Sequence, residues 1–149
     1  ISWEVITMKV KEIMTKDVAC VQPDDTIEQA AKIMKQHGCG SIPVCWGNKL
    51  EGVVTDRDIA MRCVADGKDG KQQKVKEIMT GAPATGQPEM DVNEAARLMS
   101  ERQIRRLPIL ENDSLVGYLA LGDISVEPAS QNSAGEALSG ISRQTNIQM

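Results

Sequence analysis

The stretch Val-Lys-Glu-Ile-Met-Thr at residues 10–15 recurs unchanged at residues 75–80, and this repetition decides the fold. When the offset of 65 is held without gaps, 17 positions between residues 10 and 60 carry the same residue as their counterparts. About three identities would be expected by chance from average composition. The chain is therefore two copies of one unit of about 50 residues.

The repeat sets the predicted organisation of the chain. Repeat 1 covers residues 8–64 and repeat 2 covers residues 75–126. Between them, residues 65–74 form a polar linker with two glycines, which is typical of a surface connection. Residues 127–149 form a polar tail, in which 134–141 is a candidate short helix.

Each copy predicts the order strand, helix, strand, strand, helix. In the first copy Thr26 is a candidate N-cap, apolar residues follow at helical spacing, and Gly38 is a candidate helix end. Two short apolar runs at 41–45 and 51–55 flank a turn typical of a hairpin, and a second helix is expected over 56–63. A single copy buries too little apolar surface to be stable alone. We therefore expect an α+β fold in which two β-α-β-β-α repeats pack sheet against sheet with pseudo-twofold symmetry, leaving clefts between the copies.

Composition excludes several classes of function. The net charge of −4 argues against a duplex DNA binder, and 2% aromatic residues argue against stacking on single strands. No apolar run reaches the ~18 residues of a membrane span. No signal peptide is visible, so the sequence predicts a cytoplasmic protein without nucleic-acid or membrane partners.

Cysteine and histidine limit the chemistry further. The four cysteines form no C-x-x-C pair and there is one histidine, so the spacing predicts no metal site and favours buried, reduced thiols. No phosphate-binding loop, zinc-protease motif or nucleophile triad is present, which indicates a protein that is not an enzyme.

The most informative local motif is Gly-Val-Val-Thr-Asp-Arg-Asp at residues 52–58. Free N–H groups at a helix start attract phosphate, the Thr55 hydroxyl can add a phosphate contact, and the Asp58 carboxylate can accept hydrogen bonds from both hydroxyls of a ribose. The same pair is also a capping box, which would use both side chains for the helix itself. In the second copy Asp123 is kept but Ala120 replaces the threonine, so the capping box is incomplete. Asp123 then serves either to bind ribose or as an acid that the helix dipole favours in the first turn, and we expect this helix start to hold phosphate less well.

A second candidate feature precedes Pro108. Arg105 and Arg106 stand where the first copy has glycine and serine, and arginine binds phosphate with two parallel hydrogen bonds. The alternative is a solvated basic patch that pairs with nearby glutamates. Lys16 and Arg57 are further cation candidates or ordinary surface charges.

The resemblance to a known family rests on an ordered set of motifs: the tandem Lys-Glu-Ile-Met-Thr, the Ala-Ala pair of the helix, Ser-Ile-Pro-Val or Arg-Leu-Pro-Ile, and Gly-Val-Val-Thr-Asp-Arg-Asp. This set resembles the cystathionine beta-synthase (CBS) domain pair, also called the Bateman module. The resemblance covers residues 8–126. It implies a stand-alone regulatory module that binds an adenosine-containing ligand in the clefts between the repeats. The expected ligand is AMP, ADP or ATP, less often S-adenosylmethionine or NAD, and no cofactor is required. It also implies a homodimer and a protein partner regulated in trans.

The resemblance, added to the motifs above, gives the full set of candidate nucleotide-binding residues. The acid that ends the Gly-x-x-Thr-x-x-Asp motif holds the ribose, the hydroxyl and basic residues reach phosphate, and the stretches 15–19 and 80–84 line the purine pocket. The set is Thr15, Lys16, Val18, Ala19, Ser41, Ile42, Pro43, Thr55, Arg57, Asp58, Thr80, Ala84, Arg105, Arg106, Leu107, Pro108 and Asp123. The alternative function is a ligand-free dimeric module that serves structure or interaction.

Overall fold

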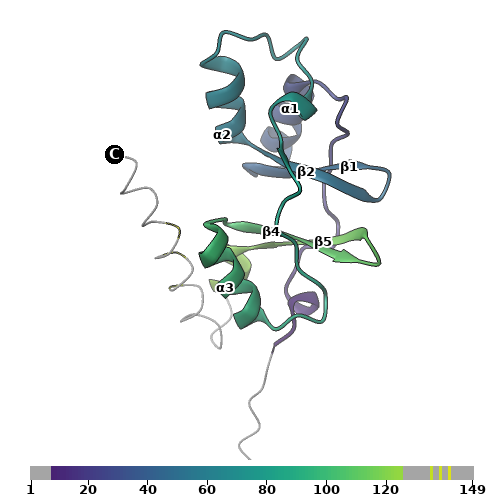
Figure 1. Ribbon diagram of the computed structural model, residues 1–149, viewed down its shortest axis with the longest axis vertical. Coiled ribbons are helices and arrows are strands. Elements are labelled where there is room, and N and C mark those ends of the chain that lie inside the picture. Colours follow the sequence, from purple (N-terminus) through teal and green to yellow (C-terminus); the bar gives the residue numbers. More distant parts are fainter. Residues whose placement is uncertain (1–7, 126–134, 136–137, 139–140, 142–149) are drawn as a thin grey trace, which may run out of the picture. The chain divides into compact units, whose positions relative to one another are not determined.

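The computed structural model describes residues 8–125 together with residues 135, 138 and 141 (Figure 1). Those last three residues are helical, while the rest of the candidate helix at 134–141 lies outside the described residues. The mixture of helices and antiparallel strands confirms the predicted α+β class.

The chain divides into two compact units, and neither coincides with one sequence repeat. Within the described segment 8–125, unit 1 contains residues 8–16, 84–111 and 116–125, and unit 2 contains residues 17–83 and 112–115. Each copy of the repeated stretch is therefore counted with the body of the other copy.

Unit 2 is built on an antiparallel hairpin. Strand β1 pairs with β2 from Ser41↔Thr55 to Trp46↔Lys49, with an irregularity between Val44 and Cys45. The turn falls where the sequence predicts it, at Gly47 with φ +62°. The elements of this unit are α1 (Ile27–His37), β1 (Ser41–Trp46), β2 (Lys49–Thr55), α2 (Asp56–Ile59), η2 (Ala60–Val64), η3 (Val75–Glu77) and β3 (Thr80–Gly81).

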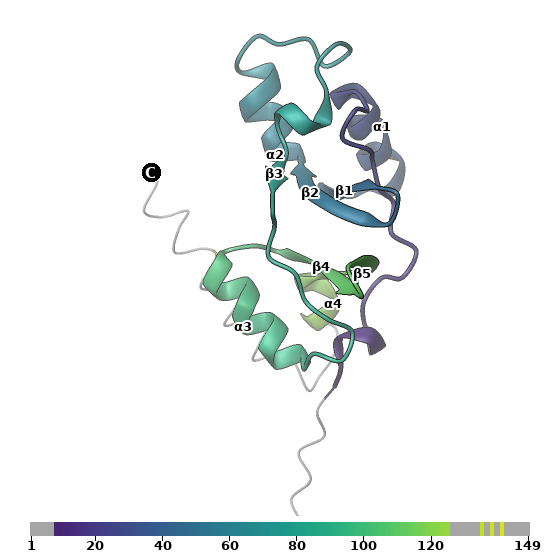
Figure 2. The same ribbon diagram turned by 45° about the vertical axis from the view of Figure 1, so that its right-hand side comes forward.

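Unit 1 repeats this plan. Its elements are η1 (Val10–Glu12), α3 (Val92–Arg102), β4 (Arg106–Glu111), β5 (Ser114–Ala120), whose first two residues are counted with unit 2, and α4 (Leu121–Ser125). Figure 2 shows α3 and α4 with the β4–β5 hairpin, and β3 beside β2 in the other unit.

The leading strand of each repeat is shorter than predicted. In the second copy it is β3, with two residues paired to β2, and in the first copy it is a single bridge between Thr15 and Tyr118. The residues that follow the repeated stretch lack the alternation of apolar and polar side chains that sustains a strand. The helix predicted over 56–63 begins at Asp56 as expected, but it becomes a π-helical turn from Ala60.

The helix signals read from the first copy are confirmed. The Thr26 hydroxyl accepts a hydrogen bond from the Gln29 N–H at 3.1 Å, and Gly38 ends α1 with φ +62°. In the second copy Asp91 caps α3, and Gln103 ends it in the left-handed region, at φ +55°.

Backbone hydrogen bonds attach each repeated stretch to the other copy. In unit 1 the Val10 N–H donates to Met90 O at 2.9 Å. In unit 2 the Val75 N–H donates to Asp25 O at 2.8 Å. The two contacts are equivalent under the offset of 65, so the exchange is reciprocal.

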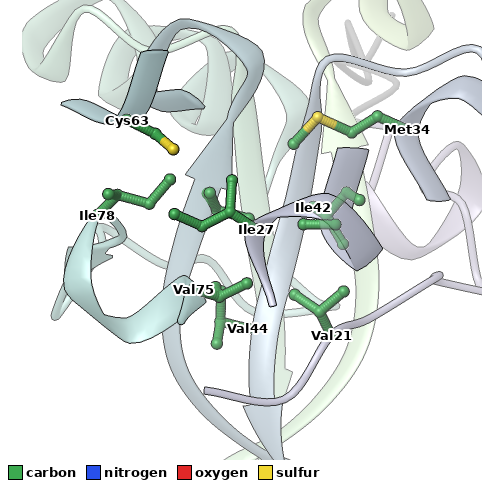
Figure 3. Packing of buried hydrophobic residues seen from close by; sticks show 10 residues of the cluster. Val21, Ile27, Met34, Ile42, Val44, Cys63, Val75 and Ile78 are labelled. Carbon is green, nitrogen blue, oxygen red and sulfur yellow. The ribbon is translucent and has the colours of Figure 1, made fainter. Parts of the chain in front are cut away.

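Buried side chains continue the same exchange. Val10 is fully buried in the core of unit 1 with Val92 and Leu107, and Val75 is fully buried in the core of unit 2 with Ile27. Figure 3 shows the core of unit 2, in which Val75 lies beside Val44 and Ile78 lies near Cys63.

Ion pairs at the surface also connect each repeated stretch to the other copy. Lys9 and Lys11 lie 2.5 and 2.6 Å from the Glu89 carboxylate. Lys74 and Lys76 make the equivalent pairs with Asp24 at 3.6 and 3.0 Å. Hydrogen bonds from Lys11 and Lys9 lower the pKa of Glu89 to about 2.

Candidate functional site

The predicted site residues fall into two groups, one in each unit. Each group draws its residues from three places. These are the end of a repeated stretch with the residues after it, the start of a strand, and the start of the second helix of a repeat. Unit 2 holds Val18, Ala19, Ser41, Ile42, Pro43, Thr55, Arg57, Asp58 and Thr80, and unit 1 holds Thr15, Lys16, Ala84, Arg105, Arg106, Leu107, Pro108 and Asp123.

In unit 2 the start of α2 meets the start of β1. The Asp56 N–H donates to Gly40 O at 2.9 Å, which fixes the beginning of the helix beside the strand. The Thr55 N–H donates to Asp58 Oδ2 at 2.9 Å, and the Asp58 N–H donates to Thr55 Oγ1 at 3.0 Å. The capping box considered for this pair is therefore formed.

The cap leaves part of the Asp58 carboxylate available. Oδ2 accepts the capping bond, whereas Oδ1 lies 3.9 Å from Nε of Arg62, and the side chain is 14% exposed. A carboxylate has about four lone-pair sites, so one capping bond does not exhaust it. Arg62, which also donates to Ile78 O at 3.1 Å, is absent from the predicted set; its spacing of four residues from Asp58 was the available signal.

In unit 1 the start of α4 meets the start of β4 in the same way, and we call this meeting of helix start and strand start the edge of each unit. The side chains at the two edges differ. The Leu121 N–H donates to Arg105 O at 2.8 Å, the counterpart of the contact between Asp56 and Gly40. Asp123 Oδ2 accepts from the Ala120 N–H at 2.9 Å. Asp123 therefore keeps one half of the capping box without a threonine, and its role in ribose binding stays a prediction.

Gly40 of unit 2 lies close to the side chain of Asp56, which is exposed. A Cβ placed on Gly40 would come within 2.7 Å of Asp56 Oδ2, so this position accepts no side chain without movement of that carboxylate. At the equivalent position of unit 1, Leu121 replaces the aspartate and Arg105 is exposed. The chemical asymmetry between the two edges follows from this exchange of residues.

Arg106 is positioned by an aromatic ring. Its guanidinium carbon lies 6.0 Å from the ring centroid of Tyr118, at the range of a cation–π contact. Tyr118 and Thr15 exchange two backbone hydrogen bonds of 2.9 Å, so Tyr118 connects two predicted site residues. Among the described residues, neither Arg105 nor Arg106 forms an ion pair, in contrast to the alternative of a patch neutralised by glutamates.

The apolar members of the set are used for packing. Ile42 and Leu107 are 1% and 0% exposed and belong to the cores of their units. Pro43 and Pro108 are also buried, and their carbonyl oxygens accept bonds from Val21 and Gly86. These four residues therefore pack the cores and present little surface to a ligand.

The remaining candidates are polar or half-buried. Val18, Ala19, Ser41 and Ala84 are half-buried, whereas Lys16, Arg57, Thr15 and Thr80 are exposed. Thr80 and Thr15 occupy equivalent places, opposite Val53 and Tyr118.

Three further observations concern the described residues alone. No helix in this part of the chain is long and apolar enough to cross a membrane. No group of three His, Cys, Asp or Glu side chains within it is arranged to hold a metal ion.

Cys45 and Cys63 are buried and Cys39 is half-buried, but Cys20 is exposed, so the expectation of four buried thiols is wrong for Cys20.

Comparisons with known proteins agree with this architecture. A family model described as CBS domain matches residues 10–64 and 75–128. The CBS domain-containing protein YhcV of Bacillus subtilis is 50% identical over 135 residues, which cover 91% of this chain and 96% of YhcV.

Two solved structures with bound ligands share the fold. The CBS domain pair of protein MJ0100, in complex with 5-methylthioadenosine and S-adenosyl-L-methionine, is 30% identical with a TM-score of 0.73, covering 80% of this chain and 94% of that one. CBSX2 in complex with AMP is 27% identical with a TM-score of 0.68, covering 79% of this chain and 93% of CBSX2.

Proposed function

Because the chain belongs to the CBS domain family, we propose that it is a regulatory module that binds an adenosine-containing ligand at the helix-start edges of its two units. AMP, ADP and ATP are the favoured ligands, with S-adenosylmethionine or NAD as less favoured ones. The module does not catalyse a reaction; it changes the behaviour of a protein partner in trans.

The observation that carries the proposal is the repeated edge. Each unit places a carboxylate, Asp58 or Asp123, in the first turn of a helix that is hydrogen-bonded to the start of a strand. Support for the ligand class comes from the two related CBS proteins, whose bound molecules all contain adenosine.

Each edge offers a different set of groups. Asp58 Oδ1 and the Thr55 hydroxyl would serve ribose and phosphate in unit 2, where Gly40 stands at the position of Arg105 and supplies no cation. Asp123 would hold ribose in unit 1, where Arg105 and Arg106 supply charge for phosphate. We therefore infer that unit 1 prefers ligands with more phosphate groups.

Calorimetric titration with adenosine, AMP and ATP tests this proposal. Asp58→Ala and Asp123→Ala should each weaken binding at their own edge by about tenfold to a hundredfold, equivalent to about 1.5–3 kcal/mol for hydrogen bonds to a charged group. Arg105→Ala should weaken ATP binding more than adenosine binding. In the titration with adenosine, which has no phosphate, Thr55→Ala is the matched control for Asp58→Ala, because it also breaks the capping box of α2 but leaves the Asp58 carboxylate in place.

The competing function is a ligand-free module for structure or interaction. The observation in its favour is that Asp58 and Asp123 already cap their own helices. Absence of binding heat for all adenosine compounds, with the fold intact by circular dichroism, would refute our proposal and leave this alternative. The homodimer and the cytoplasmic location stay predictions from the sequence, and sedimentation measurements would test the first of them.

A further inference from the structure

Two of the four cysteine sulfurs lie close together in unit 2. The Sγ atoms of Cys20 and Cys45 are 3.8 Å apart, and their residues are 25 positions apart in the chain. Backbone bonds hold the two segments side by side: the Val21 N–H donates to Pro43 O at 3.1 Å, and the Cys45 N–H donates to Val21 O at 2.8 Å. The two cysteine-bearing segments are therefore held side by side by the fold itself.

The local backbone allows the sulfurs to come closer. A disulfide has an S–S distance of about 2.05 Å, so the two atoms need to approach by about 1.8 Å. Cys20 is exposed and lies outside any helix or strand, and Cys45 follows the irregularity between residues 44 and 45 of β1. A bulge disrupts the ladder locally, which leaves the strand able to adjust there.

The two thiols differ in reactivity. The Cys45 thiol donates its hydrogen bond to the Cys20 sulfur and thereby lowers the pKa of Cys20. The same hydrogen bond, together with burial, raises the pKa of Cys45. Cys20, an exposed residue, therefore carries more thiolate character than Cys45, and the thiolate is the nucleophilic form of cysteine.

We propose that Cys20 and Cys45 form a dithiol that a peroxide converts to an intramolecular disulfide. The Cys20 thiolate attacks one oxygen of hydrogen peroxide, the O–O bond breaks, and the released hydroxide takes a proton to become water. Cys45 sulfur then attacks the Cys20 sulfenic acid, the S–O bond breaks, and the Cys45 proton leaves with the hydroxide as a second water. Two thiols lose two electrons in total and one peroxide gains them, and dithiothreitol reverses the change.

The disulfide would close a loop that contains α1 and would join the segment before this helix to β1, the strand that follows it. A cross-link over about 25 residues restricts the unfolded chain, so the oxidised protein should melt roughly 5–10 °C higher. This inference is independent of the proposed nucleotide binding, because it requires no ligand.

Mass spectrometry after peroxide treatment tests the pairing. Tryptic cleavage places Cys20 in fragment 17–32 and both Cys39 and Cys45 in fragment 36–49. The experiment therefore uses full-length Cys39→Ser, in which a link between these two fragments identifies one disulfide. We expect a mass loss of about 2 Da in the intact protein, a cross-linked fragment pair, and full reversal by dithiothreitol.

Two further variants separate the roles of the sulfurs. In Cys45→Ser the Cys20 sulfenic acid has no partner, so dimedone should trap it, whereas in Cys20→Ser the buried Cys45 should stay a thiol under the same treatment. Cys39→Ser is the matched control and should behave as the parent protein. All thiols remaining free at peroxide levels that oxidise Cys45→Ser, or links that involve Cys63 or a second molecule, would overturn the proposal.

Discussion

Replacement of Val10 by alanine tests the exchange of the repeated stretches. Val10 is 0% exposed and packs in the core of unit 1, so the change removes two buried carbon groups and leaves a cavity. At about 0.8 kcal/mol for each carbon, plus a cavity term, the free energy of unfolding should fall by about 2–3 kcal/mol. Val75→Ala in the core of unit 2 is the matched change at the equivalent position and should cost about the same.

A double-mutant cycle identifies which core each valine occupies. Urea unfolding followed by circular dichroism would be measured for Val10→Ala combined with Val92→Ala, and for Val10→Ala combined with Ile27→Val. The first pair shares a core and should show coupling of about 0.5 kcal/mol or more, whereas the second pair should be additive within about 0.5 kcal/mol. Coupling of Val10 with Ile27 and additivity with Val92 would refute the exchange, since it would place residues 8–16 on the body of their own repeat.

Two further changes test surface contacts. Glu89→Gln should destabilise the protein at pH 7, because the folded state lowers the pKa of Glu89 to about 2. The difference in urea midpoint from the parent should disappear as the pH falls from about 4.5 to about 2, since protonation removes the contribution of Glu89. Glu101→Gln, which also removes one exposed carboxylate, controls for the change in net charge. Ala120→Thr should supply the missing acceptor for the Asp123 N–H and raise the free energy of unfolding by about 0.5–1 kcal/mol, so an unchanged or lower urea midpoint would show that the second edge cannot form the full capping box.

Most of the fold could be predicted because local signals agree with the duplication. Thr26 and Gly38 delimit α1 by their capping chemistry, and the turn at Gly47 separates two apolar runs. The end of α3 had no such signal, because Gln103 adopts the left-handed conformation that glycine usually supplies. The π-helical turn from Ala60 also follows from no local pattern in the sequence.

The exchange itself was beyond sequence reasoning for a physical reason. The stretches at 10–15 and 75–80 are identical, so their side chains carry no information about which body each one joins. The unit in which each stretch packs depends on where the chain enters and leaves that unit, and identical residue types cannot predict this.

The candidate site was predictable in its residue types and less so in its supporting contacts. Asp58 and Asp123 stand out by their repeat, and the structure adds that both cap their helices. Tyr118, beneath Arg106, carried no motif signal because Val53 replaces it in the first copy. The contact between Gly40 and Asp56 depends on a hydrogen bond between two segments, so it is visible only in three dimensions.

Because each repeated stretch packs with the other copy, the order of synthesis on the ribosome decides when each core can form. Val10 leaves the exit tunnel early, but its buried neighbours include Leu119 and Ile124, which are translated more than a hundred residues later. At about 5–20 residues per second, the emerging valine waits for roughly 5–20 seconds before that site exists. The buried cluster around Ile27 is complete once Ile78 has been made, so it can form well before the cluster that buries Val10, which waits for Ile124.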